Sequence, residues 1–332
     1  MLTLPTSLAR LVVFLVLVGA LAGSGITQTP AKAGVTPFAY DQTAPLDLRE
    51  TEVQNIDRIS IHDISYVSPK GGRVPAYLVV PQGKGPFAAI EFVHWGQGNR
   101  TEFLSEALLY ARGGAICLLI DAPSNRPDSQ SGPSFMENPE RDYQEFVQLV
   151  VDIRRGLDVL LARGDVDKTR VAYVGHSLGA TWGGTLAGVE NRPRVYVLMG
   201  GLPNLTDFSG EDSFSKRVRE KYSGEQIKNY KAVMGPIDPE VFVRHAAPAH
   251  LYFQFARWDR YITRSFAERY VAAASQPKLA RFYDTSHEFN DVQSQCDRAS
   301  WIVTELNLSK GDTAAPCGRI QKLMGHKGRN VQ

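Results

Sequence analysis

The stretch VAYVGHSLGATWGG, residues 171–184, holds the residues of this sequence whose types and spacing best suit catalysis. An apolar run ends in Gly175, Ser177 and Gly179, the G-x-S-x-G spacing, and small residues follow. In this pattern a sharp turn between a strand and a helix exposes the serine hydroxyl, and the glycines avoid clashes that side chains would cause. We therefore predict that Ser177 is a nucleophile and that the N–H of Leu178, at the positive end of the helix, binds an oxyanion. The alternative is a glycine-rich turn with an incidental serine.

A serine nucleophile needs a base to accept its proton, and the base needs an acid to orient it. In hydrolases with this turn, the chain order is serine, acid, histidine. The histidines after Ser177 are His245, His250, His287 and His326. His287 follows the strand-like run KLARFYDT, so it lies at the carboxyl end of a strand, where parallel sheets carry their functional loops. We predict that His287 is the base; the alternative is a helix-capping or surface histidine.

The orienting acid is predicted to be Asp259, which follows the apolar run HLYFQFARW and also lies at the carboxyl end of a strand. The competing acids are Asp121, Asp284 and Glu288. The first precedes the serine, and the other two are too close to His287 in sequence to reach its far side. A surface aspartate remains the alternative for Asp259.

A second oxyanion donor is expected in the loop EFVHWGQGNR, because it follows the strand AAIEFV. The N–H of Trp95 is the candidate; alternatively, His94 and Trp95 only close the end of the strand. Trp182 and Trp258 flank the same region and are predicted to bind substrate by lining an apolar pocket. Core packing is the alternative role for both.

The surrounding pattern indicates an α/β fold with a mostly parallel central sheet and helices on both faces. Apolar runs predict strands at residues 59–68, 73–81, 88–95, 114–123, 170–177, 195–201, 250–256 and 278–285. Helical spacing is found at residues 101–114, 141–164, from 178 onward, at 264–275 and near the end of the chain. The first two strands are separated by Pro-Lys-Gly-Gly, which predicts a hairpin.

Three cysteines are present, an odd number. Cys117 lies in an apolar run and is predicted to be a buried, inert thiol. Cys296 and Cys317 flank the last predicted helix and could pair in an oxidising compartment. No CxxC motif or Cys/His cluster indicates a metal site.

The residues quoted above, in the order HWGQG, GHSLGA, QFARWD and YDTSHEF, resemble the α/β-hydrolase superfamily over residues 58–305. The likeness is closest to its dienelactone-hydrolase-like and serine esterase members. It implies acyl transfer to water through an acyl-enzyme, with a small-molecule ester as substrate and no metal or organic cofactor. Dienelactone hydrolases carry cysteine where this chain has Ser177, which argues against dienelactone as the substrate.

The predicted organisation is a signal peptide at 1–22, an irregular segment at 23–50, an α/β-hydrolase domain at 51–309 and a tail at 310–332. A small helical cap is expected at about 202–248. Arg10, the apolar run Leu11 to Leu21 and the small residues Ala20 and Ala22 are typical of a secretory signal. The protein is therefore expected to be secreted or periplasmic, without stable membrane insertion once the signal is removed. An uncleaved N-terminal anchor is the alternative.

A formal net charge of +2 with no basic stripe argues against a nucleic-acid partner. Together these features predict a secreted serine hydrolase that cleaves carboxylic esters. Three alternatives remain: a serine peptidase of the prolyl-oligopeptidase style, an acyltransferase, and a non-catalytic hydrolase-like binding protein.

Overall fold

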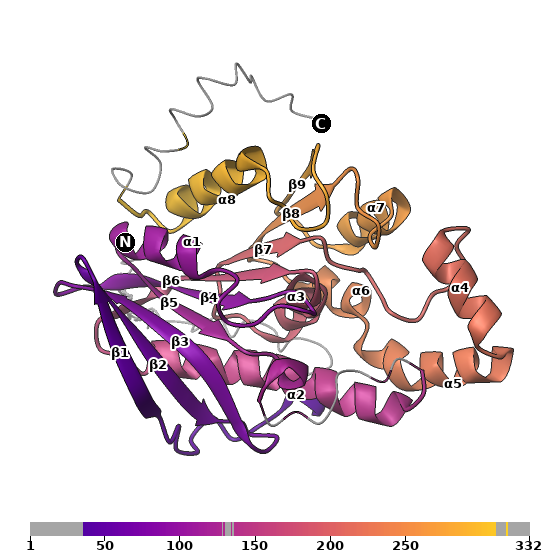
Figure 1. Ribbon diagram of the computed structural model, residues 1–332, viewed down its shortest axis with the longest axis horizontal. Coiled ribbons are helices and arrows are strands. Elements are labelled where there is room, and N and C mark those ends of the chain that lie inside the picture. Colours follow the sequence, from indigo (N-terminus) through magenta and orange to yellow (C-terminus); the bar gives the residue numbers. More distant parts are fainter. Residues whose placement is uncertain (1–35, 128, 130–133, 135, 310–316, 318–332) are drawn as a thin grey trace, which may run out of the picture. The chain divides into compact units, whose positions relative to one another are not determined.

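The central element of the protein is one β-sheet flanked by helices (Figure 1). A computed structural model describes residues 36–127, 129, 134, 136–309 and 317. Within these residues, nine strands form the sheet in the order β1-β2-β3-β5-β4-β6-β7-β8-β9. The strands are β1 (Arg49–Ile56), β2 (Ile59–Val67), β3 (Arg73–Pro81), β4 (Phe87–Val93), β5 (Ala115–Ile120), β6 (Val166–His176), β7 (Val195–Met199), β8 (His250–Ala256) and β9 (Lys278–Tyr283).

The sheet is antiparallel at one end and parallel over the rest. Strands β1, β2 and β3 pair antiparallel with one another, and β3 pairs antiparallel with β5. All further neighbours, from β5 through β4, β6, β7 and β8 to β9, are parallel. The mostly parallel α/β sheet predicted from the sequence is therefore confirmed. The sequence pattern predicts no strand at β1, because all of its side chains are exposed and no alternation of buried and exposed positions marks it.

The helices cover both faces of the sheet. They are α1 (Leu104–Arg112), α2 (Pro139–Leu161), α3 (Leu178–Val189), α4 (Ser213–Lys221), α5 (Gly224–Met234), α6 (Pro239–Phe242), α7 (Arg264–Ala273) and α8 (Val292–Glu305). Short 3-10 turns lie at Thr36–Phe38, Pro123–Asn125, Gly235–Ile237 and Val243–His245. One hydrophobic core lies between the sheet and α2, α3 and α7, and the other between the sheet and α1 and α8. In Figure 1, α1 and α8 lie on the opposite side of the sheet from α2.

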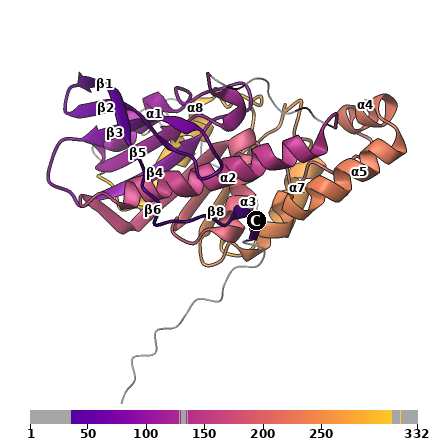
Figure 2. The ribbon, with the colours of Figure 1, turned by 90° about the horizontal axis from the view of Figure 1, so that it is seen from below.

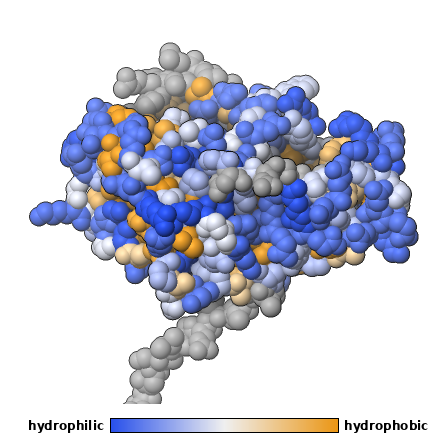
Figure 3. All heavy atoms as spheres, turned by 60° about the horizontal axis from the view of Figure 1, so that its bottom comes forward, coloured by the Kyte–Doolittle hydropathy of each residue, from blue (hydrophilic) through white to orange (hydrophobic). Residues whose placement is uncertain are grey.

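The insertion between β7 and β8 carries α4, α5 and α6. Helix α5 packs against α2 and α6 packs against α3, so the insertion extends from one face of the sheet (Figure 2). The surface over α4 and α5, at the right of Figure 3, is mostly hydrophilic. Within the described residues, no helix combines the length and apolar character needed to cross a bilayer. The predicted signal segment at 1–22 lies outside the described residues.

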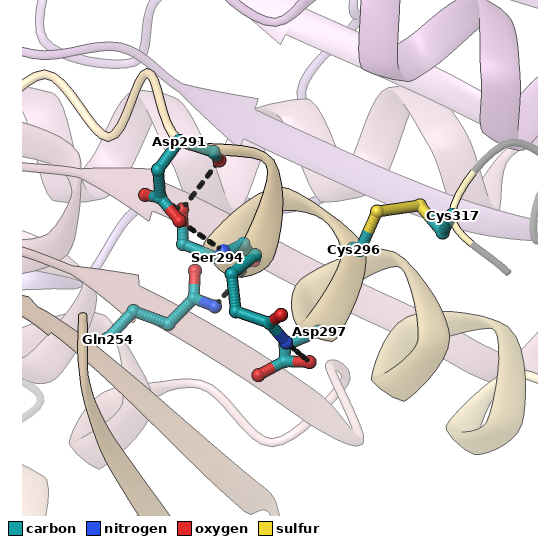
Figure 4. Close-up of a disulfide and its surroundings, with 7 residues drawn as sticks. Gln254, Asp291, Ser294, Cys296, Asp297 and Cys317 are labelled. Carbon is teal, nitrogen blue, oxygen red and sulfur yellow. Dashed lines mark hydrogen bonds between the residues drawn. A yellow bond between two sulfur atoms is a disulfide. The ribbon is translucent and has the colours of Figure 1, made fainter. Parts of the chain in front are cut away.

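Helix α8 follows the loop that carries His287, and polar contacts fix where it begins. The Asp291 carboxylate caps the helix by accepting from the Ser294 amide at 2.7 Å, and the Gln254 side chain on β8 donates to the Ser294 carbonyl at 2.9 Å (Figure 4). Further along α8, Cys296 forms a disulfide with Cys317 (Figure 4). Cys117 is a free thiol and is buried, as predicted, and burial raises its pKa.

Candidate active site

Ser177 lies in a strained turn between β6 and α3. Its φ is +50° and its ψ is −98°, a left-handed conformation that a residue with a side chain rarely adopts. The turn is so tight that a Cβ at Gly175 would clash with the backbone of Gly179, and a Cβ at Gly179 would clash with the backbone of Val93. The Ser177 amide donates to the Met199 carbonyl at 2.7 Å, which ties the turn to the end of β7. The half-buried serine hydroxyl is thereby presented at the carboxyl edge of the sheet.

The three residues predicted as nucleophile, base and acid lie within hydrogen-bond distance of one another. His287 Nε2 is 2.8 Å from Ser177 Oγ, and His287 Nδ1 is 2.7 Å from Asp259 Oδ2. The side chains of the histidine and aspartate are only 3% and 1% exposed. Because the carboxylate accepts from Nδ1, Nε2 is left to accept a proton from the serine. This arrangement has the geometry needed to activate a serine hydroxyl.

Asp259 is held by contacts of its own. Its Oδ1 accepts from the amides of Tyr261 and Ile262 at 2.8 and 2.9 Å, which leaves Oδ2 directed at His287. The Tyr261 ring lies edge-on to the imidazole of His287, with 4.8 Å between the ring centroids. The tyrosine is 41% exposed, so one side of this contact faces solvent.

The two predicted oxyanion donors differ in availability. The Leu178 amide, the first N–H of α3, has no hydrogen-bond partner in the described part of the chain. The Trp95 amide instead donates to Glu102 Oε2 at 2.8 Å. It is therefore not free to bind an oxyanion in this structure, and the sequence prediction for Trp95 is wrong, because a carboxylate seven residues further along captures this N–H.

His94, in the same loop, is fixed as a neutral imidazole. Its Nδ1 lies 2.6 Å from the carbonyl of Trp95 and must donate, while Nε2 accepts from the amide of Ala122 at 3.0 Å. Burial also lowers the pKa of His94, which favours the neutral ring. Since both nitrogens are engaged with backbone groups, His94 shapes the loop and has no nitrogen left for proton transfer.

The two tryptophans predicted to bind substrate lie in different environments. Trp182, on α3, is fully buried and stacks on Phe146 of α2, with 4.4 Å between the ring centroids. Its predicted role is wrong, because this position on α3 faces the core rather than the sheet edge. Trp258 is 75% exposed and borders a hollow of about 290 Å³ that Asp259 and Phe282 also line.

Two residues near the site are not indicated by the sequence pattern. His176 Nδ1 and Glu102 Oε1 are 2.6 Å apart, and the His176 ring lies beside that of His287, with 5.3 Å between the centroids. The position of His176 in G-x-S-x-G accepts any residue type, so the motif carried no signal for it. Glu102 stands just before α1, and only the folded structure brings it to the serine. Among the described residues, no group of three or more His, Cys, Asp or Glu side chains is arranged to hold a metal ion.

Comparison with known proteins identifies the family. The family model described as acetyl xylan esterase (AXE1) matches residues 40–230, more than half of the chain. The chain belongs to the acetyl xylan esterase family. It is accordingly a serine carboxylic ester hydrolase. The matched residues include the turn at Ser177 and end before Asp259 and His287.

Solved structures of acetyl xylan esterases share the fold. The enzyme from Paenibacillus sp. R4 aligns with a TM-score of 0.64 and 22% identity, covering 78% of this chain and 89% of its own. Acetyl xylan esterase 1 from Thermoanaerobacterium sp. JW/SL YS485 aligns with a TM-score of 0.69 and 15% identity, covering 82% of this chain and 91% of its own. A prolyl endopeptidase aligns with a TM-score of 0.58 and 16% identity, covering 77% of this chain but 40% of its own. No curated protein matches the chain with significance. These likenesses establish the α/β-hydrolase fold.

Proposed function

We propose that this esterase removes acetyl groups from an acetylated carbohydrate through an acyl-enzyme formed on Ser177. The observation that carries the proposal is the hydrogen-bonded chain from Asp259 through His287 to Ser177, with contacts of 2.7 and 2.8 Å. Membership of the acetyl xylan esterase family supports the acetyl group and the carbohydrate.

In the first step His287 Nε2 accepts the Ser177 proton while Oγ attacks the ester carbonyl. The imidazolium that forms donates from Nδ1 to Asp259, whose buried carboxylate stabilises the positive charge. The two amides on Asp259 Oδ1 keep this carboxylate in place throughout. As the tetrahedral intermediate collapses, His287 protonates the leaving oxygen of the sugar, and a water molecule then attacks the acyl-enzyme by the same proton route.

The developing oxyanion is bound by the Leu178 amide at the start of α3. The second donor comes from the loop after β4. Since the Trp95 amide is used by Glu102, we assign the role to the next amide, that of Gly96, which is exposed and has no partner in the described part of the chain. Each such donor contributes about 3 kcal/mol to transition-state stabilisation in comparable enzymes.

The alcohol side of the ester is placed against the exposed aromatic rings beside the acid and the base. Trp258 and Tyr261 flank Asp259 in sequence, and both are exposed. Flat aromatic faces bind ligands by apolar contact while the rim of the site stays polar, as a sugar requires. Charged residues of the insertion between β7 and β8 would then meet the more distant parts of a polymeric substrate.

Secretion is part of the proposal. The signal-like N-terminal sequence supports it, and so does the disulfide between Cys296 and Cys317, because disulfides persist in oxidising compartments. N-terminal sequencing of protein recovered outside the cytoplasm of its host would begin near residue 23. An intact N-terminus on membrane-bound protein would point to an anchor instead.

The deciding experiment compares the wild-type protein with Ser177→Ala and with Ser65→Ala, whose hydroxyl lies on β2 and accepts from Arg73. Each is given p-nitrophenyl esters of graded chain length, acetylated xylo-oligosaccharides, aminoacyl amides and a fluorophosphonate probe. We expect wild type and Ser65→Ala to be labelled and to prefer acetyl esters, and Ser177→Ala to be unlabelled and inactive. Faster cleavage of amides than of esters would favour a peptidase. A wild-type protein that is neither labelled nor active would refute the proposed function.

A further inference from the structure

His176 bridges two parts of the site. It is 3% exposed and ends β6, immediately before Ser177. Its Nε2 lies 2.8 Å from the backbone carbonyl of His287, and its Nδ1 lies 2.6 Å from Glu102 Oε1. Its ring stacks parallel to that of Trp95, with 5.9 Å between centroids, and its centroid is 5.3 Å from that of His287. The imidazole is therefore buried between the base and the loop after β4.

Glu102 continues the link into that loop. While Oε1 contacts His176, Oε2 accepts the Trp95 amide at 2.8 Å. The loop is folded closely around this carboxylate, since a Cβ at Gly98 would come within 3.0 Å of both the Trp95 ring and Glu102 Oε2. One carboxylate thus holds both His176 and the backbone from which the second oxyanion donor is drawn.

The chemistry of the contacts fixes where the protons lie. The carbonyl of His287 can only accept, so Nε2 of His176 carries a hydrogen. The contact between Nδ1 and Glu102 holds one further proton, so the pair is neutral overall and both of its hydrogen bonds are satisfied. His94 differs, because its Nε2 accepts from a backbone amide and its ring is neutral. Both ring nitrogens of His176 are thus hydrogen-bonded, and neither is available to accept the proton of Ser177.

We propose that His176 and Glu102 are positioning residues that fix the positions of the His287 backbone and the oxyanion loop relative to Ser177. The proposal rests on the proposed function, in which His287 is the base. Displacing catalytic groups by about 1 Å costs on the order of 10²-fold in rate. Because this bridge contacts both His287 and the loop after β4, it restrains the displacement of each. Its loss should therefore lower the rate of the chemical step more than it weakens substrate binding.

Substitutions at His176 separate its two bonds. His176→Phe keeps a flat ring but removes both, and we expect kcat to fall by about 10- to 100-fold with KM changed less than about threefold. His176→Gln places an amide N–H near the position of Nε2 and should restore part of kcat by renewing the bond to His287. His176→Asn places one near Nδ1, renews only the bond to Glu102 and should restore less.

Substitutions at Glu102 test the other end. Glu102→Leu removes both carboxylate contacts and should lower kcat about as much as His176→Phe. Glu102→Gln should rescue most of that loss, because its carbonyl oxygen accepts from Trp95 and its amide donates to His176. If the two residues form one link, the double variant His176→Phe/Glu102→Leu will be no slower than the slower single variant.

A matched control is Glu106→Leu. Glu106 and Glu102 have similar side-chain exposure, 23% and 20%, and each pairs with a buried partner, Arg298 for Glu106 and His176 for Glu102. Glu106→Leu breaks the pair with Arg298, on the side of the sheet covered by α1 and α8, so it should lower the melting temperature without changing the rate per folded molecule. This variant measures what loss of a buried ion pair does to stability alone.

The readout is the rate at which a fluorophosphonate labels Ser177 in the full chain, measured per folded molecule across pH beside kcat for p-nitrophenyl acetate. Slow labelling in His176→Phe and Glu102→Leu, with the acidic limb of the wild-type pH profile retained, is the expected result. Labelling as fast as in Glu106→Leu, or multiplying effects in the double variant, would overturn the proposal. A wild-type protein that is not labelled at all would instead remove the proposed function, and this inference with it.

Discussion

The turn at Ser177 and the insertion between β7 and β8 meet the same central sheet but are held by different kinds of contact. At the turn, backbone approaches backbone: the glycines of GHSLG leave no room for a methyl group, and α3 is buried from Gly179 to Val189. The outer part of the insertion depends instead on side chains at the surface, including the Asp212 cap of α4 and the pairing of Arg269 on α7 with Glu240.

This difference indicates how each region tolerates change. Backbone contacts position a nucleophile to within a fraction of an ångström, and they fail when a single atom is added. Side-chain pairs at a half-exposed surface can be replaced at little cost in folding free energy. The turn is therefore suited to fixed chemistry, and the insertion to varying the choice of substrate.

The largest expected effect is a loss of rate in Asp259→Asn. An asparagine amide would donate to His287 Nδ1, so Nε2 would carry the hydrogen and could no longer accept the Ser177 proton. We expect kcat for p-nitrophenyl acetate to fall by about 10⁴-fold. The control in the insertion is Asp212→Asn, because asparagine also caps helices well and activity should stay at the wild-type level. Comparable losses in both variants would remove the distinction between the regions.

The second effect is the addition of one methyl group at Gly179. The new Cβ would lie within 3.0 Å of the Val93 carbonyl, so strand β4 or the turn must move. We expect Gly179→Ala to lower the free energy of unfolding by about 1–3 kcal/mol and kcat by about 10²-fold.

The same change at Gly224, in the first turn of α5, is the control, because an added Cβ there meets nothing within 4 Å. Gly224→Ala should keep wild-type activity and wild-type stability or better. Denaturant unfolding and esterase assays of both variants measure the contrast, and a Gly179→Ala protein as active as Gly224→Ala would contradict it.

The sequence predicts the turn well because its constraints are local. Two glycines around Ser177, an apolar run before it and small residues after it specify strand, turn and helix together. The positions of His287 and Asp259 follow from a general rule, that parallel strands end on the same edge. The fold class and the nucleophile's setting could therefore be read without a structure.

Other features depend on contacts between distant segments and could not be read from the sequence. Glu102 reaches His176 across 74 positions and also takes the amide of Trp95. Trp182 is near Ser177 in sequence, but the rotation of α3 directs it into the core. Strand β1 gave no signal because both of its faces are exposed. In each case tertiary packing, rather than local pattern, decided the outcome.

The third effect is a pH dependence of stability within the insertion. Burial raises the pKa of Asp238 to about 7, despite its bonds from Thr206 Oγ1 and the Leu205 amide. The nearby charges are those of Glu240, which raises the pKa further, and Arg269, which lowers it. The native state therefore keeps a proton that the unfolded chain loses near pH 4, so stability falls as pH rises from about 4 to 7.

Asp238→Asn should abolish this part of the pH dependence. A pKa shift of this size changes the free energy of unfolding by at most about 4 kcal/mol. We expect the wild-type free energy of unfolding to decline over this pH range more steeply than that of the variant, as measured by urea denaturation at several pH values. The pH profile of kcat should be the same for both proteins, because the site is held independently. Parallel declines in stability would refute the role of Asp238.

The smallest effect is expected at the pairing of Arg269 with Glu240 and Asp207, which joins α7 to the insertion. The arginine side chain is 42% exposed, so solvent screens the pair, and Arg269→Gln should lower the free energy of unfolding by less than about 1 kcal/mol. In 1 M salt the difference from wild type should largely vanish. For p-nitrophenyl acetate kcat should stay within about twofold of wild type, while KM for an acetylated xylo-oligosaccharide rises because the insertion moves relative to the sheet edge. A fall in kcat as large as that of Gly179→Ala would place the insertion among the elements that position Ser177, and the contrast between the two regions would fail at this point.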